Sequence, residues 1–181
     1  MDNPTSFFRV ALILGGARSG KSRYALGLSR GRAAPRLFVA TGEAGDAEMA
    51  ARIAHHQAER GPDWVTREAP LALVETLASA QGNYGVILVD CLTLWLSNLM
   101  LREDKGEADL DQDCERLIAA LERTATPTIL ISNEVGWGIV PDNPLARAFR
   151  DKAGWLHQRL AQIADLVALT VAGLPLVIKV R

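Results

Sequence analysis

The sequence predicts a doubly wound α/β fold, in which a mostly parallel sheet carries helices on both faces, and three observations support this. Short runs rich in Val, Ile and Leu alternate with helical patterns, which is the order expected of parallel strands joined by helices. The apolar runs lack polar alternation, as expected for strands covered on both faces. A chain of 181 residues with 49% hydrophobic content suffices for one sizeable core, so we expect a single domain over residues 1–181.

The expected elements follow one another along the chain. Strands are predicted at residues 9–15, 36–41, 84–90, 127–133 and 165–171, and the stretch WVTRE is expected to follow a short strand. Helical patterns lie at about 21–31, 46–60, 70–81, 92–103, 111–125 and 143–163. The stretch LVALTVAGLPLVI is interrupted by Gly173 and Pro175 and is shorter than the roughly 20 residues of a membrane-spanning helix. It predicts two strands joined by a turn, and we expect no membrane span.

Charge and cysteine content limit the classes of function. Twenty Lys and Arg residues against 21 Asp and Glu residues leave a formal charge of −1, which gives no attraction to nucleic acid or anionic lipid. The expected ligands are therefore small molecules. Cys91 and Cys114 have neither the spacing of a zinc site nor the density of a disulfide scaffold, and the start MDNPTSFFRV lacks the basic segment of a secretory signal. These features favour the cytoplasm.

The stretch GGARSGKS matches the Walker A pattern, with Gly15, four residues, and then Gly20, Lys21 and Ser22. An apolar strand precedes it and a helical pattern follows, which is the context that a phosphate-binding loop needs. Loop glycines let the backbone wrap phosphates, Lys21 reaches the outer phosphates and the Ser22 hydroxyl can hold Mg²⁺. The fold is therefore expected to be of the P-loop NTPase type, with ATP or GTP bound by Gly15, Gly16, Ala17, Arg18, Ser19, Gly20, Lys21 and Ser22.

Asp90 ends the apolar run VILVD, which is the arrangement of a Walker B carboxylate that orients Mg²⁺ or its water shell. The alternative is an Asp that caps the helix beginning near Thr93. The phosphate loop favours the magnesium interpretation, with Ser22 and Asp90 as the metal-binding pair.

Two adjacent histidines occur in DAEMAARIAHHQAER, and helical periodicity gives them different surroundings. His56 shares a stripe with Met49 and Ile53, whereas His55 lies on the polar side with Glu48 and Glu59. A neutral imidazole is a good nucleophile toward phosphorus, so His55 is a candidate for a covalent nucleotidyl intermediate. An outward histidine that is merely solvated is the alternative.

Four stretches together resemble the bifunctional adenosylcobinamide kinase and adenosylcobinamide-phosphate guanylyltransferase family of cobalamin biosynthesis. They are GGARSGKS, ATGEAGDAEMAARIAHH, LVDCLTLWLSNLM and SNEVGWGIVPDNPLARAFRDKAGWLHQRLA, and the similarity runs from about Leu14 to Ala161. The resemblance implies that ATP or GTP phosphorylates adenosylcobinamide. GMP from GTP is then attached to the new phosphate, which gives adenosylcobinamide-GDP and pyrophosphate.

The resemblance also implies residue roles. The first histidine of the HH pair, His55, would carry GMP as a phosphoramidate, with Lys21 as the other catalytic residue. Glu68 would accept hydrogen bonds from guanine or ribose, although a solvated charge at a strand end is the alternative. The family's nucleotide site would add to the phosphate loop the residues Ala40, Thr41, Gly42, His56, Gln57, Ala58, Glu59, Glu68 and Asp90.

Three further expectations follow from the resemblance. Asn133 and Glu134 open a loop expected to contact corrinoid or nucleotide. The pair His157-Gln158 stands where the family pattern has Asn-Gln, and we expect this change to affect packing or a subunit contact rather than chemistry. Four tryptophans exceed what a small core must hold, which favours a homo-oligomer; the family implies small rings, with a trimer as the expected form.

Other functions stay open on the sequence. An ordinary small-molecule or nucleotide kinase would leave His55 a bystander, and a nucleotide-dependent switch would hydrolyse its nucleotide without an acceptor. Family variants of archaeal type transfer GMP without kinase activity. The intact phosphate loop and the histidine pair together favour the bifunctional enzyme.

Overall fold

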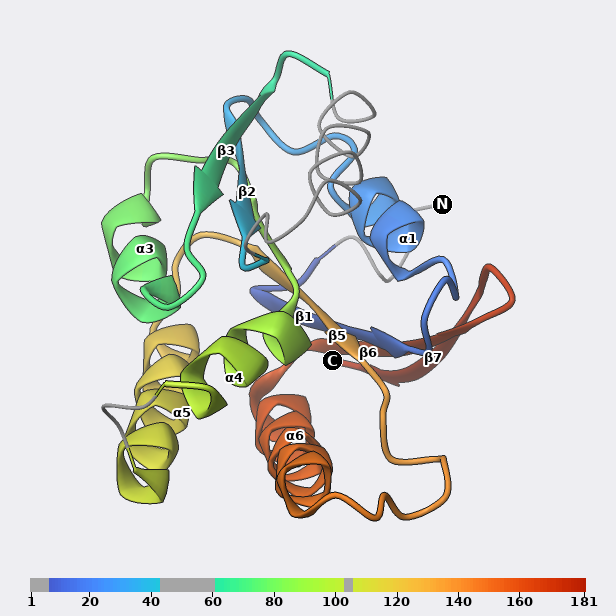
Figure 1. Cartoon of the computed structure of the whole chain (residues 1–181). Helices are drawn as coiled ribbons and strands as arrows, with labels where there is room; N and C mark the ends of the chain where they lie inside the picture. The colour runs from blue at the N-terminus through green and yellow to red at the C-terminus, as the bar shows by residue number, and fades with distance from the viewer. Residues whose placement is uncertain (1–6, 43–60, 103–105) are drawn as a thin grey trace.

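A single seven-stranded sheet organises the computed structural model, which describes residues 7–42, 61–102 and 106–181 (Figure 1). The strand order is β3-β2-β4-β5-β1-β6-β7, and every pairing is parallel except that between β6 and β7. The predicted α/β class with a mostly parallel sheet is confirmed. The strands are β1 (Val10–Gly15), β2 (Arg36–Ala40), β3 (Trp64–Glu68), β4 (Ile87–Asp90), β5 (Thr128–Asn133), β6 (Leu166–Val171) and β7 (Leu174–Val180).

Five described helices cover the two faces of the sheet. Helices α3, α4, α5 and α6 pack on one face and α1 packs on the other (Figure 1). Adjacent strand residues serve opposite faces, so that Leu12 points to the four-helix side while Ala11 and Ile13 point to the α1 side. The helices are α1 (Lys21–Leu28), α3 (Leu73–Ala80), α4 (Leu92–Met100), α5 (Glu107–Glu122) and α6 (Pro144–Ile163).

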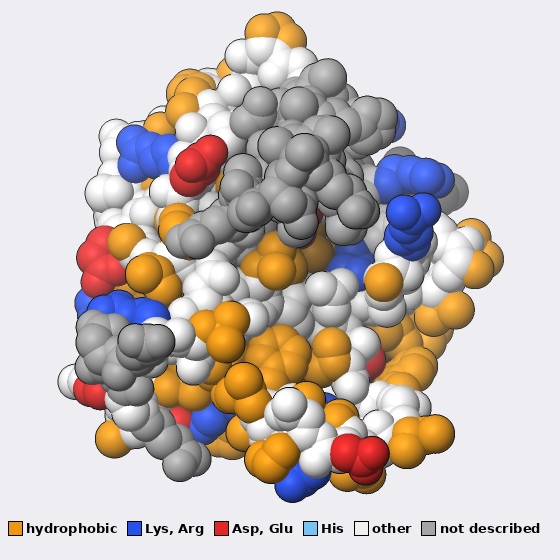
Figure 2. Space-filling model, in the orientation of Figure 1, with side chains coloured by type: hydrophobic (Ala, Val, Ile, Leu, Met, Phe, Trp, Pro, Cys, Tyr) orange, Lys and Arg blue, Asp and Glu red, His pale blue; other side chains and the backbone are white. Residues whose placement is uncertain are grey.

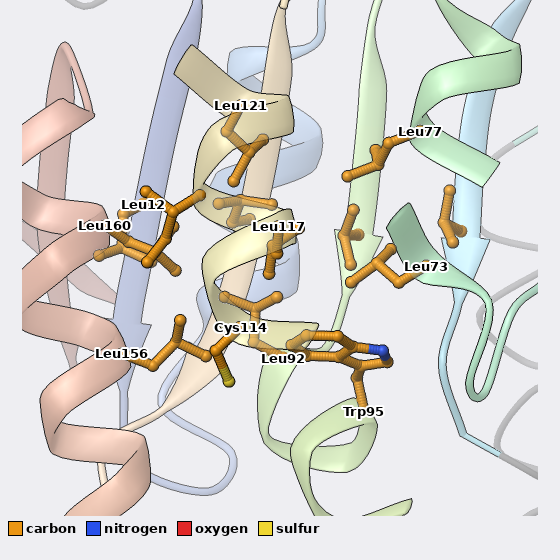
Figure 3. Packing of buried hydrophobic residues seen from close by; sticks show 14 of the residues in the cluster. Leu12, Leu73, Leu77, Leu92, Trp95, Cys114, Leu117, Leu121, Leu156 and Leu160 are labelled. Atoms are coloured by element: carbon orange, nitrogen blue, oxygen red, sulfur yellow. The ribbon is translucent and has the colours of Figure 1, made fainter. Parts of the chain in front are cut away.

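Leucine side chains from several helices fill the core on the four-helix side (Figure 3). Leu12 from β1 lies close to Leu160 of α6, and Leu117 of α5 lies near the middle of the same cluster. Trp95 of α4 lies in the same cluster and is only 1% exposed. A buried Trp usually needs a partner for its N–H, and Trp95 Nε1 donates to the Leu71 carbonyl at 3.1 Å.

Two helix starts show how local residues set the boundaries. Asn143 caps α6, since its Oδ1 accepts from the amides of Leu145 at 2.8 Å and Ala146 at 3.2 Å. The predicted start near residue 143 is confirmed. Helix α5 begins at Glu107, four residues before the predicted 111, because Asp109 Oδ2 accepts from the Gly106 amide and completes a capped first turn. The helix predicted at 46–60 lies outside the described residues.

Parallel pairing brings the carboxyl ends of four strands to one edge of the sheet. Ala40 at the end of β2 pairs with Asp90 at the end of β4, and Gly15 at the end of β1 pairs with Asn133 at the end of β5. Ligands in open α/β sheets bind at this edge. The fold therefore brings Gly15, Ala40, Asp90 and Asn133, which come from separate sequence stretches, to the same side of the sheet.

Candidate functional site

The loop between β1 and α1 has a backbone that only particular residues adopt easily. Gly15 and Gly20 have φ values of +152° and +98°, and Arg18 has a φ of +55°. A side chain at Gly15 would place its Cβ 2.5 Å from Thr170 Oγ1. The first and last glycines of the motif are therefore required by conformation and by close packing.

Neighbouring strands hold this loop in place. Glu134, directly after β5, donates its amide to the Gly15 carbonyl at 3.0 Å. On the other side, the Ser19 and Thr170 hydroxyls lie 2.8 Å apart, and the Gly173 amide donates to the Ser19 carbonyl at 2.9 Å. The loop is thus fixed from β5 and from the turn between β6 and β7. The sequence pattern gave no local signal for Thr170, because only the strand order brings it here.

Lys21 lies at the first position of α1 and reaches back across the loop. Its Nζ donates to the Gly16 carbonyl at 2.6 Å, and the residue is only 7% exposed. The start of α1 presents backbone amides and the positive end of the helix dipole to the same space. Figure 2 shows Lys and Arg side chains gathered on the side of this face where α1 lies. The loop therefore has the charge and the donors of a phosphate site.

Ser22 and Asp90 come together although 68 residues separate them. Ser22 Oγ donates to Asp90 Oδ2 at 3.0 Å. Asp90 belongs to β4, and the residue at the N-cap of α4 is Cys91, so the structure does not give Asp90 the alternative role of a helix cap. A hydroxyl and a carboxylate are oxygen ligands of the kind that Mg²⁺ takes beside a nucleotide. Both side chains thus fit the magnesium role predicted for them.

The other predicted residues fall into three groups. Ala40 ends β2 and pairs with Asp90, and Thr41 and Gly42 follow it; Thr41 is fully buried. Glu68 ends β3 opposite Ala40 and is exposed, so its carboxylate is free of the core. The predictions for His55, His56, Gln57, Ala58 and Glu59 concern positions outside the described residues.

The loop after β5 carries both polar and apolar side chains. Asn133 Nδ2 donates to Thr93 Oγ1 at 2.8 Å, so the asparagine faces α4. Glu134 Oε1 accepts from the Gly136 amide at 2.7 Å and shapes the turn. Beyond it, Trp137 and Ile139 are 76% and 96% exposed. The loop thus begins at the phosphate site and ends in a surface with exposed apolar side chains.

His157 is buried inside the chain rather than at its surface. It lies in α6 at 7% exposure, and its Nε2 is 2.7 Å from Ser132 Oγ in β5. Burial lowers the pKa of His157 from its ordinary value, and the nearby charge of Glu134 opposes this in part. The expectation that this position affects packing agrees with its place in the structure.

Among the residues that the structure describes, no helix is both long and apolar enough to cross a bilayer. This finding agrees with the two-strand interpretation of the stretch at residues 166–178, which forms β6 and the first part of β7.

Comparisons with known proteins agree with this geometry. The family model described as cobinamide kinase / cobinamide phosphate guanyltransferase matches residues 11–178. A bifunctional adenosylcobalamin biosynthesis protein CobP of Pseudomonas aeruginosa is 49% identical over 168 residues, covering 93% of this chain and 96% of the relative. A bifunctional adenosylcobalamin biosynthesis protein CobU of Salmonella typhimurium is 42% identical over 181 residues, covering 94% of this chain and 99% of the relative.

The sheet and its helices also resemble a solved structure of distant sequence. A prototypical ATPase from a bacterial type III secretion system superposes with a TM-score of 0.54 at 15% identity. The match covers 89% of this chain but only 50% of the ATPase chain. At this level of identity the similarity shows the fold alone.

Proposed function

This chain belongs to the cobinamide kinase / cobinamide phosphate guanyltransferase family, and from this premise we propose how its residues divide the two reactions. The enzyme phosphorylates cobinamide and transfers a guanylyl group to cobinamide phosphate. We assign the phosphate loop to both reactions. The observation that supports this assignment is the hydrogen bond of Ser22 to Asp90, together with the contact of Lys21 Nζ with the Gly16 carbonyl in the same loop.

In the kinase reaction, the acceptor hydroxyl attacks the γ phosphorus and the nucleoside diphosphate leaves. The Lys21 ammonium and the loop amides neutralise the negative charge that grows on the outer phosphates. A magnesium ion held by Ser22 and Asp90, directly or through water, would add charge compensation at the same phosphates. Positioning and electrostatics suffice for a loose phosphoryl transition state.

In the guanylyl reaction, attack occurs at the α phosphorus and pyrophosphate leaves. Charge again grows on the outer phosphates, so Lys21 and the loop serve this step without rearrangement. We assign the nucleophile to His55, whose neutral imidazole would form a P–N bond to GMP as the bond to pyrophosphate breaks. The phosphate of the acceptor would then displace the imidazole and give the GDP derivative.

Base recognition is assigned to the edge strand. Glu68 is exposed at the carboxyl end of β3, on the same edge as Asp90 and two strands away from it. A carboxylate there can accept hydrogen bonds from guanine N–H groups or from the ribose hydroxyls. The adenine of ATP lacks the guanine donors, so Glu68 would favour GTP.

The experiment that tests the division of labour is His55→Ala, assayed for both reactions. Guanylyl transfer should fall by at least about a hundredfold, whereas kinase activity should persist. Wild-type protein incubated with α-labelled GTP should retain acid-labile label, and protein incubated with γ-labelled GTP should not. A His55→Ala variant that retains the α label contradicts the assignment, and equal loss of both activities points to structural damage.

We further propose that the enzyme acts in the cytoplasm as a homo-oligomer, with a trimer as the form that the family favours. Tryptophan exposure gives limited support, because Trp95 is buried and only Trp137, at 76%, is largely exposed. Stronger support comes from β7, an edge strand whose apolar side chains are mostly exposed. An exposed apolar patch on an edge strand is typical of a site where another chain binds.

A further inference from the structure

Thr41 lies beside the proposed magnesium site but does not face the space where a nucleotide would bind. It is fully buried, and each of its polar groups has a partner inside the protein. Its amide donates to the Asp90 carbonyl at 3.2 Å, and its carbonyl accepts from Asn98 Nδ2 at 2.8 Å. Its hydroxyl is equally occupied. A direct contact between the Thr41 side chain and a nucleotide would require one of these bonds to break.

The Thr41 hydroxyl brackets the backbone of Cys91, the residue after Asp90. Oγ1 donates to the Cys91 carbonyl at 2.7 Å and accepts from the Cys91 amide at 2.8 Å. Together with the amide bond to Asp90, three hydrogen bonds run from Thr41 to the two residues at the end of β4. The backbone that carries the Asp90 carboxylate is thus fixed from the β2 side.

A second set of contacts fixes the same backbone from the β5 side. Cys91 Sγ lies 3.1 Å from Thr93 Oγ1, which accepts from Asn133 Nδ2 at 2.8 Å. Asn133 ends β5, and Thr93 is only 6% exposed. Buried hydrogen-bonded groups of this kind hold their backbone to one position, because breaking any one leaves an unsatisfied polar group. Asp90 therefore projects from a segment that both neighbouring strands clamp.

From these contacts we propose that Thr41 is a positioning residue for magnesium, acting through Asp90 and not through the nucleotide. The clamp holds Asp90 Oδ2 at hydrogen-bond distance from Ser22 Oγ, so that both oxygens are in place before the ion arrives. Side chains that are already oriented bind a metal ion without the entropic cost of ordering them on binding. This inference rests on the proposed magnesium site of Ser22 and Asp90, and it gives Thr41 a role different from the nucleotide contact expected from the family.

The test is the magnesium dependence of nucleotide binding by Thr41→Val, which keeps the shape of the side chain and removes the hydroxyl. The probe is fluorescent N-methylanthraniloyl GDP, titrated at equilibrium at several Mg²⁺ concentrations and in EDTA. The Mg²⁺ concentration for half-saturation should rise about tenfold, as expected when buried hydrogen bonds to a ligand's support are lost. Affinity in EDTA should stay within about twofold of wild type, and Thr41→Ser should restore the wild-type Mg²⁺ requirement.

Thr128→Val is the matched control. Thr128 is also fully buried, and its hydroxyl donates to the Thr126 carbonyl at 2.9 Å. It is the first residue of β5, however, so it lies at the amino-terminal ends of the strands, away from the proposed site. Its loss should lower thermal stability in the way that Thr41→Val does, without changing the Mg²⁺ requirement. Should Thr41→Val fail to fold, Thr93→Val removes the clamp on the β5 side and should raise the Mg²⁺ requirement in the same direction.

Two results would overturn the role of Thr41 while leaving the proposed function intact. One is a folded Thr41→Val, or Thr93→Val in its place, whose Mg²⁺ requirement equals that of wild type. The other is an affinity that falls as much in EDTA as in Mg²⁺, which would indicate direct contact with the nucleotide. A wild-type protein whose affinity does not depend on Mg²⁺ would instead contradict the magnesium site itself, and with it the inference about Thr41.

Discussion

The Lys21 ammonium group is the one that we expect to contact the outer phosphates of the nucleotide in both reactions. Its Nζ donates to the Gly16 carbonyl, so the side chain is already aimed across the loop. Lys21→Met should therefore lower kcat/KM of the kinase and of the guanylyltransferase alike, each by about 10²–10³-fold, because a single electrostatic donor is lost from both transition states.

Radiochemical assays with γ-labelled and α-labelled GTP measure the two effects of Lys21→Met separately. Lys152→Met is a suitable control, since that lysine lies on α6 in an ion pair with Asp111. A variant in which only one activity falls would show that the two reactions use different phosphate sites.

The buried imidazole of His157 makes stability depend on pH. Its pKa in the folded chain is lowered by burial, so the unfolded chain binds the proton more readily. As pH falls below the ordinary value of 6.5, protonation favours the unfolded state, and the free energy of unfolding decreases by up to about 1.4 kcal/mol per pH unit until the lowered pKa is reached. Above pH 7 this contribution is constant.

Urea unfolding of wild type and His157→Gln at pH values from 7.5 to 5 checks this dependence. The glutamine amide reaches the position of Nε2 and can keep a hydrogen bond to Ser132 but has no proton to gain, so its stability should decrease less over that range. Parallel curves for the two proteins would show that other groups cause the loss.

At this scale the sequence predicts residues whose chemistry is local and misses those defined by contact. The Walker pattern predicts Ser22, and the strand-end position predicts Asp90, because both signals lie within a few residues of each site. The buried bonds of Thr41 and the place of Thr170 beside Ser19 depend on which strand ends are neighbours. No pattern along the chain contains that information.

Helix α6 contains a glycine that no contact requires. Gly154 lies mid-helix, and a Cβ built there meets no atom within 4 Å. An alanine loses less backbone conformational entropy on folding than a glycine does. Gly154→Ala should therefore raise the free energy of unfolding by about 0.5–1 kcal/mol. Urea denaturation measures the change.

Gly85→Ala serves as the contrast for Gly154→Ala, because its Cβ would lie 2.0 Å from the Ala33 carbonyl oxygen. That variant should be strongly destabilised. If Gly154→Ala were destabilised as well, the α6 surface at this position would have to be covered by another chain.

At the level of elements, the periodic apolar pattern predicts most of the order of strands and helices, and side-chain capping decides where a helix begins. The predicted strands match the observed ones because a short apolar run between two helical patterns is typical of a buried strand. The predicted start of α5 was wrong by four residues, because the charged stretch before residue 111 has no apolar stripe. The helix nevertheless begins earlier, since Asp109 accepts a hydrogen bond from the Gly106 amide in the first turn. Side-chain capping outweighs periodicity there.

Considered as a whole, the molecule leaves one edge of its sheet apolar. Leu174 and Leu176 occupy alternate positions in β7 and lie on one face, and Ile178 lies where the pairing with β6 shifts register; their exposures are 73%, 61% and 61%. The sequence predicts this strand but not its exposure, because a fully apolar run is typical of a buried strand. A second chain that covers this face would remove the exposed apolar area from water.

The double substitution Leu176→Glu/Ile178→Glu should therefore convert the protein to a monomer. Each added carboxylate would have to be buried unpaired in the interface, at a cost of several kcal/mol. Sedimentation velocity at micromolar concentration measures the mass, and Val65→Glu on β3, the opposite edge strand, is the control, since Val65 is also exposed at 41%. A double variant that keeps the wild-type mass, or a wild type that is already monomeric, contradicts the proposal.

Loss of association should also weaken nucleotide binding, because the turn into β7 contacts the phosphate loop. The Gly173 amide donates to the Ser19 carbonyl, and a Cβ on Gly20 would lie 3.0 Å from the Gly173 Cα. A neighbouring chain that orders β7 orders this turn and, through it, the loop. GDP titrated into the monomeric variant should bind several-fold more weakly than to wild type, whereas Val65→Glu should bind as wild type does. Equal affinity in a confirmed monomer would show that the loop is rigid without the neighbouring chain.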